Sequence, residues 1–117
     1  MGIHGVGVDV VDLARFAQTL ERTPTMRTRL FTDSERDLKV ESLAGRFAAK
    51  EALAKAMGAP SGLSWQDFEV VNDANGAPRF VLHGAAPDRV RQLGITTIHL
   101  SISHDTTVAT AFVVAEC

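Results

Sequence analysis

Four charged side chains fall within one predicted helix, residues 46–58. The segment is rich in Ala, Leu, Lys and Glu and contains no proline, which favours an α-helix. Arg46 and Lys50 lie one turn apart with the same charge, which is mildly destabilising unless an anion lies between them. Glu51 and Lys55 have the order and spacing of a stabilising ion pair, and this pair is the simpler explanation of Glu51. The other explanation is that the helix presents its charges to a ligand.

The same helix has no clear solvent face. Its bulky apolar residues form one stripe that also contains Arg46 and Lys50, and the opposite side is almost entirely alanine. A surface helix normally has one apolar stripe and one charged face. We therefore expect this helix to be buried on most sides while carrying charges that a hydrophobic core does not need.

A second acid, Asp9, stands inside a predicted strand rich in valine. Acids are depleted from strands, and a buried carboxylate needs a cation or several hydrogen-bond donors. The alternative is that Asp9 ends its strand and caps the next helix, but Asp12 is better placed to do so. Gly5 and Gly7 allow close approach of another backbone or a ligand. They do not form a dinucleotide-binding motif, because Val10 stands where the third glycine is required.

A third polar group, formed by Ser101, Ser103, His104 and Asp105, ends an apolar strand near the C-terminus. Hydroxyls and an imidazole at a strand end are suited to contact a phosphate or to position a substrate. The alternative is a simple strand end with turn-forming residues. A hydrolase triad of Ser103, His104 and Asp105 is excluded, because neighbours in an extended strand point to opposite faces.

Length and composition limit the class of protein. A chain of 117 residues suits one domain, residues 1–117, with a modest core. The net charge of -2 argues against general nucleic-acid binding. A membrane-spanning helix needs about 20 consecutive apolar residues, and no segment of the sequence approaches this length. No secretory signal is visible at the N-terminus. The one cysteine, Cys117, excludes an internal disulfide and a cysteine-rich metal site, which suits a reducing, cytoplasmic location.

The elements that must position these residues are predicted in the order βαααββαββ. Strands are expected at residues 3–11, 68–72, 78–83, 97–103 and 107–114, and helices at residues 13–21, 26–30, around Glu51 and at 87–93, with a capped turn at 32–35. Residues 73–76 are typical of a hairpin turn. We therefore expect an α+β fold in which a mainly antiparallel sheet packs against one long central helix and several short ones.

The motifs occur together in the order and spacing of a known family. The chain resembles the holo-acyl-carrier-protein synthases, the short, single-domain 4′-phosphopantetheinyl transferases. The resemblance is carried by Gly5-x-Gly7-x-Asp9 with Arg15, by Arg46-Phe47-x-x-Lys50-Glu51-Ala52-x-x-Lys55-Ala56-x-Gly58, and by Ser101-x-Ser103-His104. It extends from about residue 2 to residue 115 and includes Asp67-Phe68-Glu69 and Asn75-Gly76-x-Pro78. Residues 32–42 are a shorter stretch than in many members.

The resemblance implies a transfer reaction. Family members move the phosphopantetheine arm of coenzyme A onto a serine of an apo acyl carrier protein, and adenosine 3′,5′-bisphosphate leaves. The family's metal is Mg²⁺, held by acids that match Asp9 and Glu51, which suits an ion that usually takes one or two protein carboxylates. Lys55 matches the lysine expected to neutralise the pyrophosphate beside the metal. Two candidates for the general base stay open, a metal-bound water and Glu51.

The resemblance also implies which side chains contact coenzyme A. Arg46 and His104 match positions that approach its phosphates, including the 3′-phosphate. Lys50 has the spacing for the same role, and Ser103 is expected to contact the cofactor beside His104.

An excess of arginine between residues 15 and 29 indicates a partner. Arg15, Arg22, Arg27 and Arg29 are accompanied only by Glu21. Arg15 and Arg22 are seven residues apart and share one helix face. A solvated helix surface is the simple explanation. In the family, however, the first helix docks on an acidic carrier protein, so these two arginines are expected to bind apo acyl carrier protein. The family also implies a homotrimer with active sites between subunits and a place in fatty-acid, hence lipid, biosynthesis.

Two other functions fit part of the pattern. A module that binds coenzyme A or another nucleotide without chemistry explains the basic residues but not two acids at Mg²⁺ positions. A structural trimer whose charged helix holds only an ion-pair network predicts no Mg²⁺-dependent heat when coenzyme A is titrated.

Overall fold

The computed structural model describes residues 2–117, and the predicted strands and short helices are present there within two residues of their expected ends. The central helix, expected at residues 46–58, begins six residues earlier, at Val40, and ends at Ala56. The strands are β1 (Ile3–Asp12), β2 (Phe68–Asn72), β3 (Pro78–Leu82), β4 (Thr97–Asp105) and β5 (Val108–Glu116). The helices are α1 (Leu13–Arg22), α2 (Thr25–Leu30), α3 (Val40–Ala56) and α4 (Ala86–Gln92), with a 3₁₀ turn, η1 (Trp65–Asp67). The expected α+β class is confirmed.

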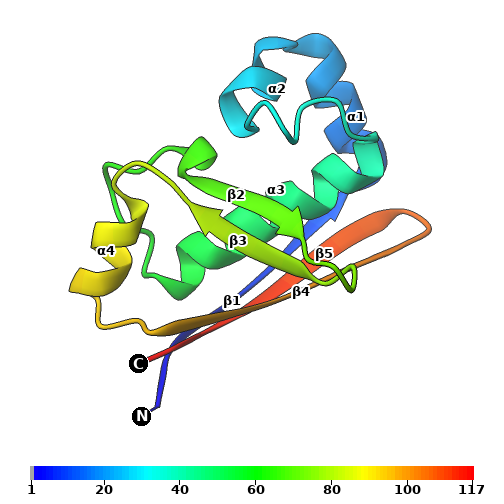
Figure 1. Ribbon diagram of the computed structural model, residues 1–117. Coiled ribbons are helices and arrows are strands. Elements are labelled where there is room, and N and C mark those ends of the chain that lie inside the picture. Colours follow the sequence, from blue (N-terminus) through cyan, green and yellow to red (C-terminus); the bar gives the residue numbers. More distant parts are fainter. Residues whose placement is uncertain (1) are drawn as a thin grey trace.

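The strands form two antiparallel sheets rather than one. The larger sheet has the order β1-β5-β4, and the smaller is the hairpin β2-β3. Figure 1 shows α3 running along the larger sheet, with the hairpin on another side of the helix and α1 and α2 near one end. The expected mainly antiparallel pairing is therefore confirmed, but α3 lies between two sheets, so its side chains reach elements that are distant in sequence.

Helix α3 is buried on nearly all sides, as its composition predicts. Nine of its 17 residues are buried, which is too many for one apolar stripe. One side faces the inner surface of β5. The side chains that point inward from this strand are small and buried, and they alternate with residues that point outward. The inward-pointing residues are Ala109, Ala111, Val113 and Ala115. None of the helices within residues 2–117, α3 included, is long and apolar enough to cross a membrane.

Strand β1 lies against the backbone of α3 because two glycines face the helix. A Cβ atom on Gly7 would lie 1.8 Å from the carbonyl oxygen of Ala52, and one on Gly5 would lie 2.2 Å from that of Ala56. The close approach expected of these glycines is therefore to a helix backbone. Since side chains alternate along a strand, Asp9 is the next residue of β1 on this inner face, and the contact places it against α3.

The outer face of the larger sheet is exposed and apolar. Val6, Val8 and Val10 point away from α3, and Phe112 lies opposite Val8 in the ladder between β1 and β5. With Ile3, these side chains are between 47 % and 63 % exposed. A contiguous apolar face of this kind is unusual on a monomeric protein and is typical of a surface that another molecule covers.

Candidate active site

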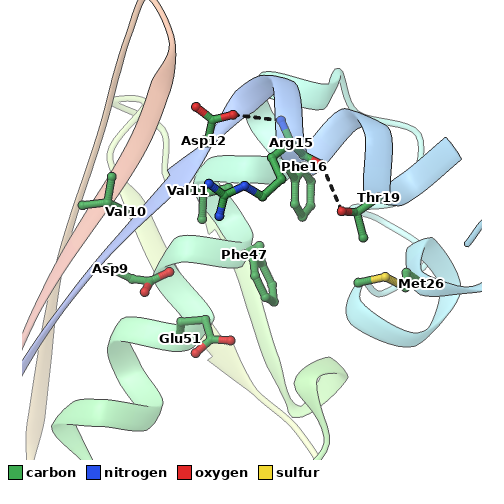
Figure 2. Close-up of a pocket in the computed structure, with 10 residues that line it drawn as sticks. All are labelled: Asp9, Val10, Val11, Asp12, Arg15, Phe16, Thr19, Met26, Phe47 and Glu51. Atoms are coloured by element: carbon green, nitrogen blue, oxygen red, sulfur yellow. Dashed lines mark hydrogen bonds between the residues drawn. The ribbon is translucent and has the colours of Figure 1, made fainter. Parts of the chain in front are cut away.

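Asp9 of β1 and Glu51 of α3 line one cavity of about 340 Å³ between β1, α1, α2 and α3. Figure 2 shows the side chain of Glu51 just below that of Asp9. Their meeting follows from the packing of β1 on α3: Glu51 immediately precedes Ala52, whose carbonyl oxygen faces Gly7. The two acids that the sequence analysis singled out separately are thus brought together.

The surroundings of Glu51 disfavour its charged form. Burial raises the pKa of Glu51, and the neighbouring Asp9 raises it further, while Lys55 opposes the rise. The ammonium of Lys55 donates to the carbonyl oxygen of Val8 at 2.9 Å and to Asp9 Oδ1 at 3.3 Å. Within residues 2–117 Lys55 forms its ion pair with Asp9. The simpler explanation of Glu51, an ion pair with Lys55, is therefore not what the structure shows.

This pair of acids fits a Mg²⁺ ion. Asp9, Asp12 and Glu51 line the cavity with Arg15, and Lys55 pairs with Asp9, so the net charge there is negative. The raised pKa of Glu51 reflects its burial first and repulsion from Asp9 second, and a nearby divalent cation would favour the charged form against both. Mg²⁺ typically takes one or two protein carboxylates and completes its octahedron with waters and substrate phosphates. Asp9 and Glu51 supply such a donor set at the wall of an open cavity.

The rest of this cavity comes from α1, α2 and α3. Asp12 caps α1 by accepting a hydrogen bond from the Arg15 backbone N–H at 2.9 Å, which sets where the helix begins (Figure 2). Arg15 therefore lines the same cavity as the two acids. The apolar walls include Phe16 and Phe47, whose rings stack with centroids 5.6 Å apart. Sequence reasoning named Phe47 only as a member of the α3 motif and did not name Phe16, because both follow the same helical spacing as ordinary core residues.

A second cavity, of about 210 Å³, brings Arg46 of α3 together with His104 of β4. The Nε of Arg46 donates to the carbonyl oxygen of Val70 at 3.3 Å. Ser103 pairs with Thr110 in the ladder and, as the neighbour of His104, points to the opposite face of the sheet. The structure thus joins Arg46 and His104 but does not bring Ser103 to them.

Comparison with known proteins identifies the family. Residues 5–112 match the model of the 4′-phosphopantetheinyl transferase superfamily. The holo-[acyl-carrier-protein] synthase of Clavibacter sepedonicus is 60 % identical over 97 % of this chain and 96 % of its own length. The chain belongs to the holo-[acyl-carrier-protein] synthases of this superfamily.

Solved structures of such synthases have the same fold. The synthase from Neisseria meningitidis is 33 % identical, with a TM-score of 0.88, over 98 % of this chain and 99 % of that one. The Helicobacter pylori synthase, solved in complex with coenzyme A, is 32 % identical with a TM-score of 0.83, over 95 % of this chain and 99 % of that one.

In this holo-[acyl-carrier-protein] synthase the two cavities lie at opposite edges of the larger sheet. The cavity lined by Asp9 and Glu51, called the carboxylate cavity below, is beside β1. The Arg46–His104 cavity is beside β4, and β5 separates the two strands. Adjacent strands are about 4.8 Å apart, so the edges are separated by roughly 10 Å. Because α3 also lies between the cavities, a group the size of a single phosphate could not reach both cavities of one chain.

Lys50 of this synthase does not lie where the sequence analysis expected it. The side chain is 0 % exposed, and its ammonium donates to Glu35 Oε1 at 2.8 Å and to the carbonyl oxygens of Leu30 and Trp65 at 2.8 and 3.1 Å. Burial lowers the pKa of Lys50, and Glu35 opposes this shift. Because all three ammonium protons have protein acceptors, we do not include Lys50 among the phosphate contacts.

Proposed function

We propose that this synthase transfers the 4′-phosphopantetheine arm of coenzyme A to a serine of an apo acyl carrier protein, with Mg²⁺, and releases adenosine 3′,5′-bisphosphate. The observation that carries the proposal is the meeting of Asp9 and Glu51 at one cavity with Lys55 beside them. The similar proteins are holo-[acyl-carrier-protein] synthases, and one of them was solved with coenzyme A, which supports an acyl carrier protein as the acceptor and coenzyme A as the donor.

The reaction requires neutralisation of phosphate charge and alignment of two oxygens. The carrier serine gives its proton to a general base, its oxygen bonds to the β-phosphorus, and the pyrophosphate bond breaks with its electron pair on the leaving oxygen. Charge neutralisation and positioning supply most of the catalysis in such transfers. Asp9 and Glu51 would hold Mg²⁺, which neutralises phosphate charge when bound. The ammonium of Lys55, held by Val8 and Asp9, is placed to neutralise a pyrophosphate at the same edge.

Arg46 and His104 are proposed to bind phosphate groups of coenzyme A, including the 3′-phosphate. Within residues 2–117 the only protein hydrogen bond of the Arg46 guanidinium is from Nε to Val70. Its two terminal nitrogens therefore stay available for a phosphate, whose oxygens a guanidinium can bind in a bidentate manner. The exposed imidazole of His104 in the same cavity supplies a second contact.

The direct test is the mass of an apo acyl carrier protein after incubation with this protein, coenzyme A and Mg²⁺. We expect a gain of one phosphopantetheine arm, and no gain when a chelator is present. A module that only binds coenzyme A would give a heat of binding but leave the carrier mass unchanged. That outcome with several carriers would reject the transfer reaction.

The active sites are proposed to form between the subunits of a homotrimer. The two cavities are separated within one chain, and the exposed apolar face of β1 and β5 offers a surface for a second copy. We expect an equal mixture of Glu51→Gln and Arg46→Ala subunits, refolded together, to recover transfer. Each required side chain is intact in half of the subunits, so about one quarter of shared sites are complete.

Two measurements complete this prediction. The mass in solution, measured by light scattering, should be three times that of the chain and should fall to that of one chain when Val8→Lys is introduced on the exposed face. No recovery of transfer in mixtures that demonstrably exchange subunits would show that each site is formed within one chain.

The carrier is proposed to dock on α1 through Arg15 and Arg22. The structure distinguishes the two side chains, because Arg15 lines the carboxylate cavity and Arg22 is exposed in the last turn of α1. Arg22→Glu therefore tests docking without changing a residue of the carboxylate cavity. We expect it to raise KM for the carrier about tenfold with little change in KM for coenzyme A. Arg91→Glu, in the last turn of α4, is the matched control. Equal losses for both substrates would refute docking through α1.

We also propose that residues 1–117 act as one domain in the cytoplasm, supplying fatty-acid biosynthesis with its carrier. One hydrophobic core cluster unites the helices and both sheets, which supports a single domain. Limited proteolysis that left two stable fragments, or fractionation that placed the protein outside the cytoplasm, would contradict this.

A further inference from the structure

Glu35 is a buried acid that the proposed chemistry does not use. It lies in the turn after α2 and is 1 % exposed. Its Oε1 accepts hydrogen bonds from the backbone N–H of Thr32 at 3.0 Å and from the ammonium of Lys50 at 2.8 Å. Its Oε2 accepts one from the backbone N–H of Val70 at 2.9 Å. A carboxylate is retained in a core only where such partners compensate for its burial.

Glu35 and Arg46 bind the same residue of β2. In an antiparallel ladder the N–H and C=O of one residue point to the same side. Those of Val70 face away from β3: its N–H donates to Glu35, and its C=O accepts from Arg46 Nε at 3.3 Å. The two side chains therefore lie next to each other along the free edge of β2, where a neighbouring strand would otherwise pair.

The charges of these side chains interact as well. Burial lowers the pKa of Arg46, and the Glu35 carboxylate opposes this shift. Glu35 also forms the ion pair with Lys50. The anion that the like-charged spacing of Arg46 and Lys50 requires is thus supplied, at least in part, by the chain itself.

We propose that Glu35 is a positioning residue for Arg46. Its carboxylate separates the two cations of α3 and, through Val70, holds the Arg46 guanidinium with its terminal nitrogens available to the cavity that Arg46 shares with His104. This inference rests on the proposed function, in which Arg46 binds the 3′-phosphate of coenzyme A. It assigns to Glu35 a role in discriminating coenzyme A from the same molecule without that phosphate.

Glu69 offers a matched comparison. It lies on the same strand and binds the same turn, accepting hydrogen bonds from Thr32 Oγ1 at 2.7 Å and from Ser34 Oγ, and its other oxygen pairs with His83 at 2.9 Å. It forms no ion pair or hydrogen bond with Arg46 within residues 2–117. Loss of the Glu69 carboxylate therefore loosens the turn without removing the anion beside Arg46.

The test is the ratio of kcat/KM for coenzyme A to kcat/KM for 3′-dephospho-coenzyme A. Glu35→Gln keeps the size of the side chain but replaces one of its two oxygens by an NH₂ group. Lys50 and the Val70 N–H bind different oxygens of Glu35, so the amide cannot accept both hydrogen bonds in this arrangement. We expect the ratio to fall roughly tenfold, and Glu69→Gln to leave it unchanged. Because Glu35→Gln leaves Lys50 without a counter-charge, the double variant Glu35→Gln/Lys50→Met is measured too, after its fold is checked by circular dichroism. The same fall is expected.

The Arg46→Ala variant separates the two levels of the proposal. It should lower the ratio by itself, and Glu35→Gln added to it should lower the ratio no further. If Arg46→Ala lowers the ratio and neither Glu35 variant does, the positioning role is rejected and the proposed function stands. A further fall in the Arg46→Ala background would show that Glu35 does not act through Arg46, and would also reject the role. If Arg46→Ala leaves the ratio unchanged, the assignment of Arg46 to the 3′-phosphate fails, and this inference with it.

Discussion

Replacing Glu51 by Gln is expected to lower kcat/KM for phosphopantetheine transfer about 10³-fold while the protein stays folded. The substitution keeps the shape of the side chain but removes one of the two negative charges at the carboxylate cavity, where Asp9 and Glu51 meet. A Mg²⁺ ion held by one carboxylate instead of two binds more weakly and less precisely. Initial rates are measured at coenzyme A concentrations below KM, with saturating carrier, over a range of Mg²⁺ concentrations, so that they report kcat/KM.

The same substitution is expected to stabilise the metal-free protein. Since the pKa of Glu51 is raised above its ordinary value of 4.5, the folded state binds a proton there more tightly than the unfolded chain does. The contribution of Glu51 to stability is therefore most favourable at low pH and is lost as the pH rises from 4.5 through the raised pKa. Above that range, Glu51→Gln should have the higher Tm, because the cost of burying the charge and the repulsion from Asp9 are both removed.

Two comparisons decide this first prediction. Mg²⁺ should raise the Tm of the native protein but not that of Glu51→Gln, since only binding to the folded state stabilises it. Asp37→Asn, which changes an exposed acid in the turn before α3, should behave like the native protein in both assays. Transfer at the native rate by Glu51→Gln would refute a metal role for this side chain.

Replacing Gly7 by Ala is expected to lower the free energy of unfolding by about 3 kcal/mol or more. The new Cβ would lie 1.8 Å from the carbonyl oxygen of Ala52, so β1 or α3 must move. Either movement separates Asp9 from Glu51, so transfer should fall together with stability. Urea unfolding followed by circular dichroism gives the free energy, and the carrier mass assay gives the activity.

The nature of this contact allows a sharp control. The atom in the way belongs to the helix backbone, so trimming the neighbouring side chain by Ala52→Gly should not rescue Gly7→Ala. Gly2→Ala should be nearly neutral, because a Cβ on Gly2 has no atom within 4 Å. A Gly7→Ala protein as stable as the native one would show that β1 does not need this close approach to α3.

The sequence by itself determined the secondary structure and its order, because the signals are local. Asp12 caps α1 through a backbone N–H only three residues away, and residues 73–76 turn the hairpin within the same short segment. The surroundings of α3 were also predictable, since alanine on one side and apolar residues on the other leave no face for water. The resemblance to the synthase family followed from the spacing of motifs and was confirmed by the comparisons.

Only the tertiary structure decided which charges meet. Lys50 has the right spacing on α3 for a phosphate contact, but the turn that carries Glu35 covers it and supplies its counter-charge. Lys55 is one turn from Glu51, yet it pairs with Asp9, which is distant in the sequence. The physical reason is the same for both, whether the lysine is buried like Lys50 or exposed like Lys55. Helix spacing shows which side chains can be neighbours along one helix, but the partner of a charge is set by the element that packs beside it.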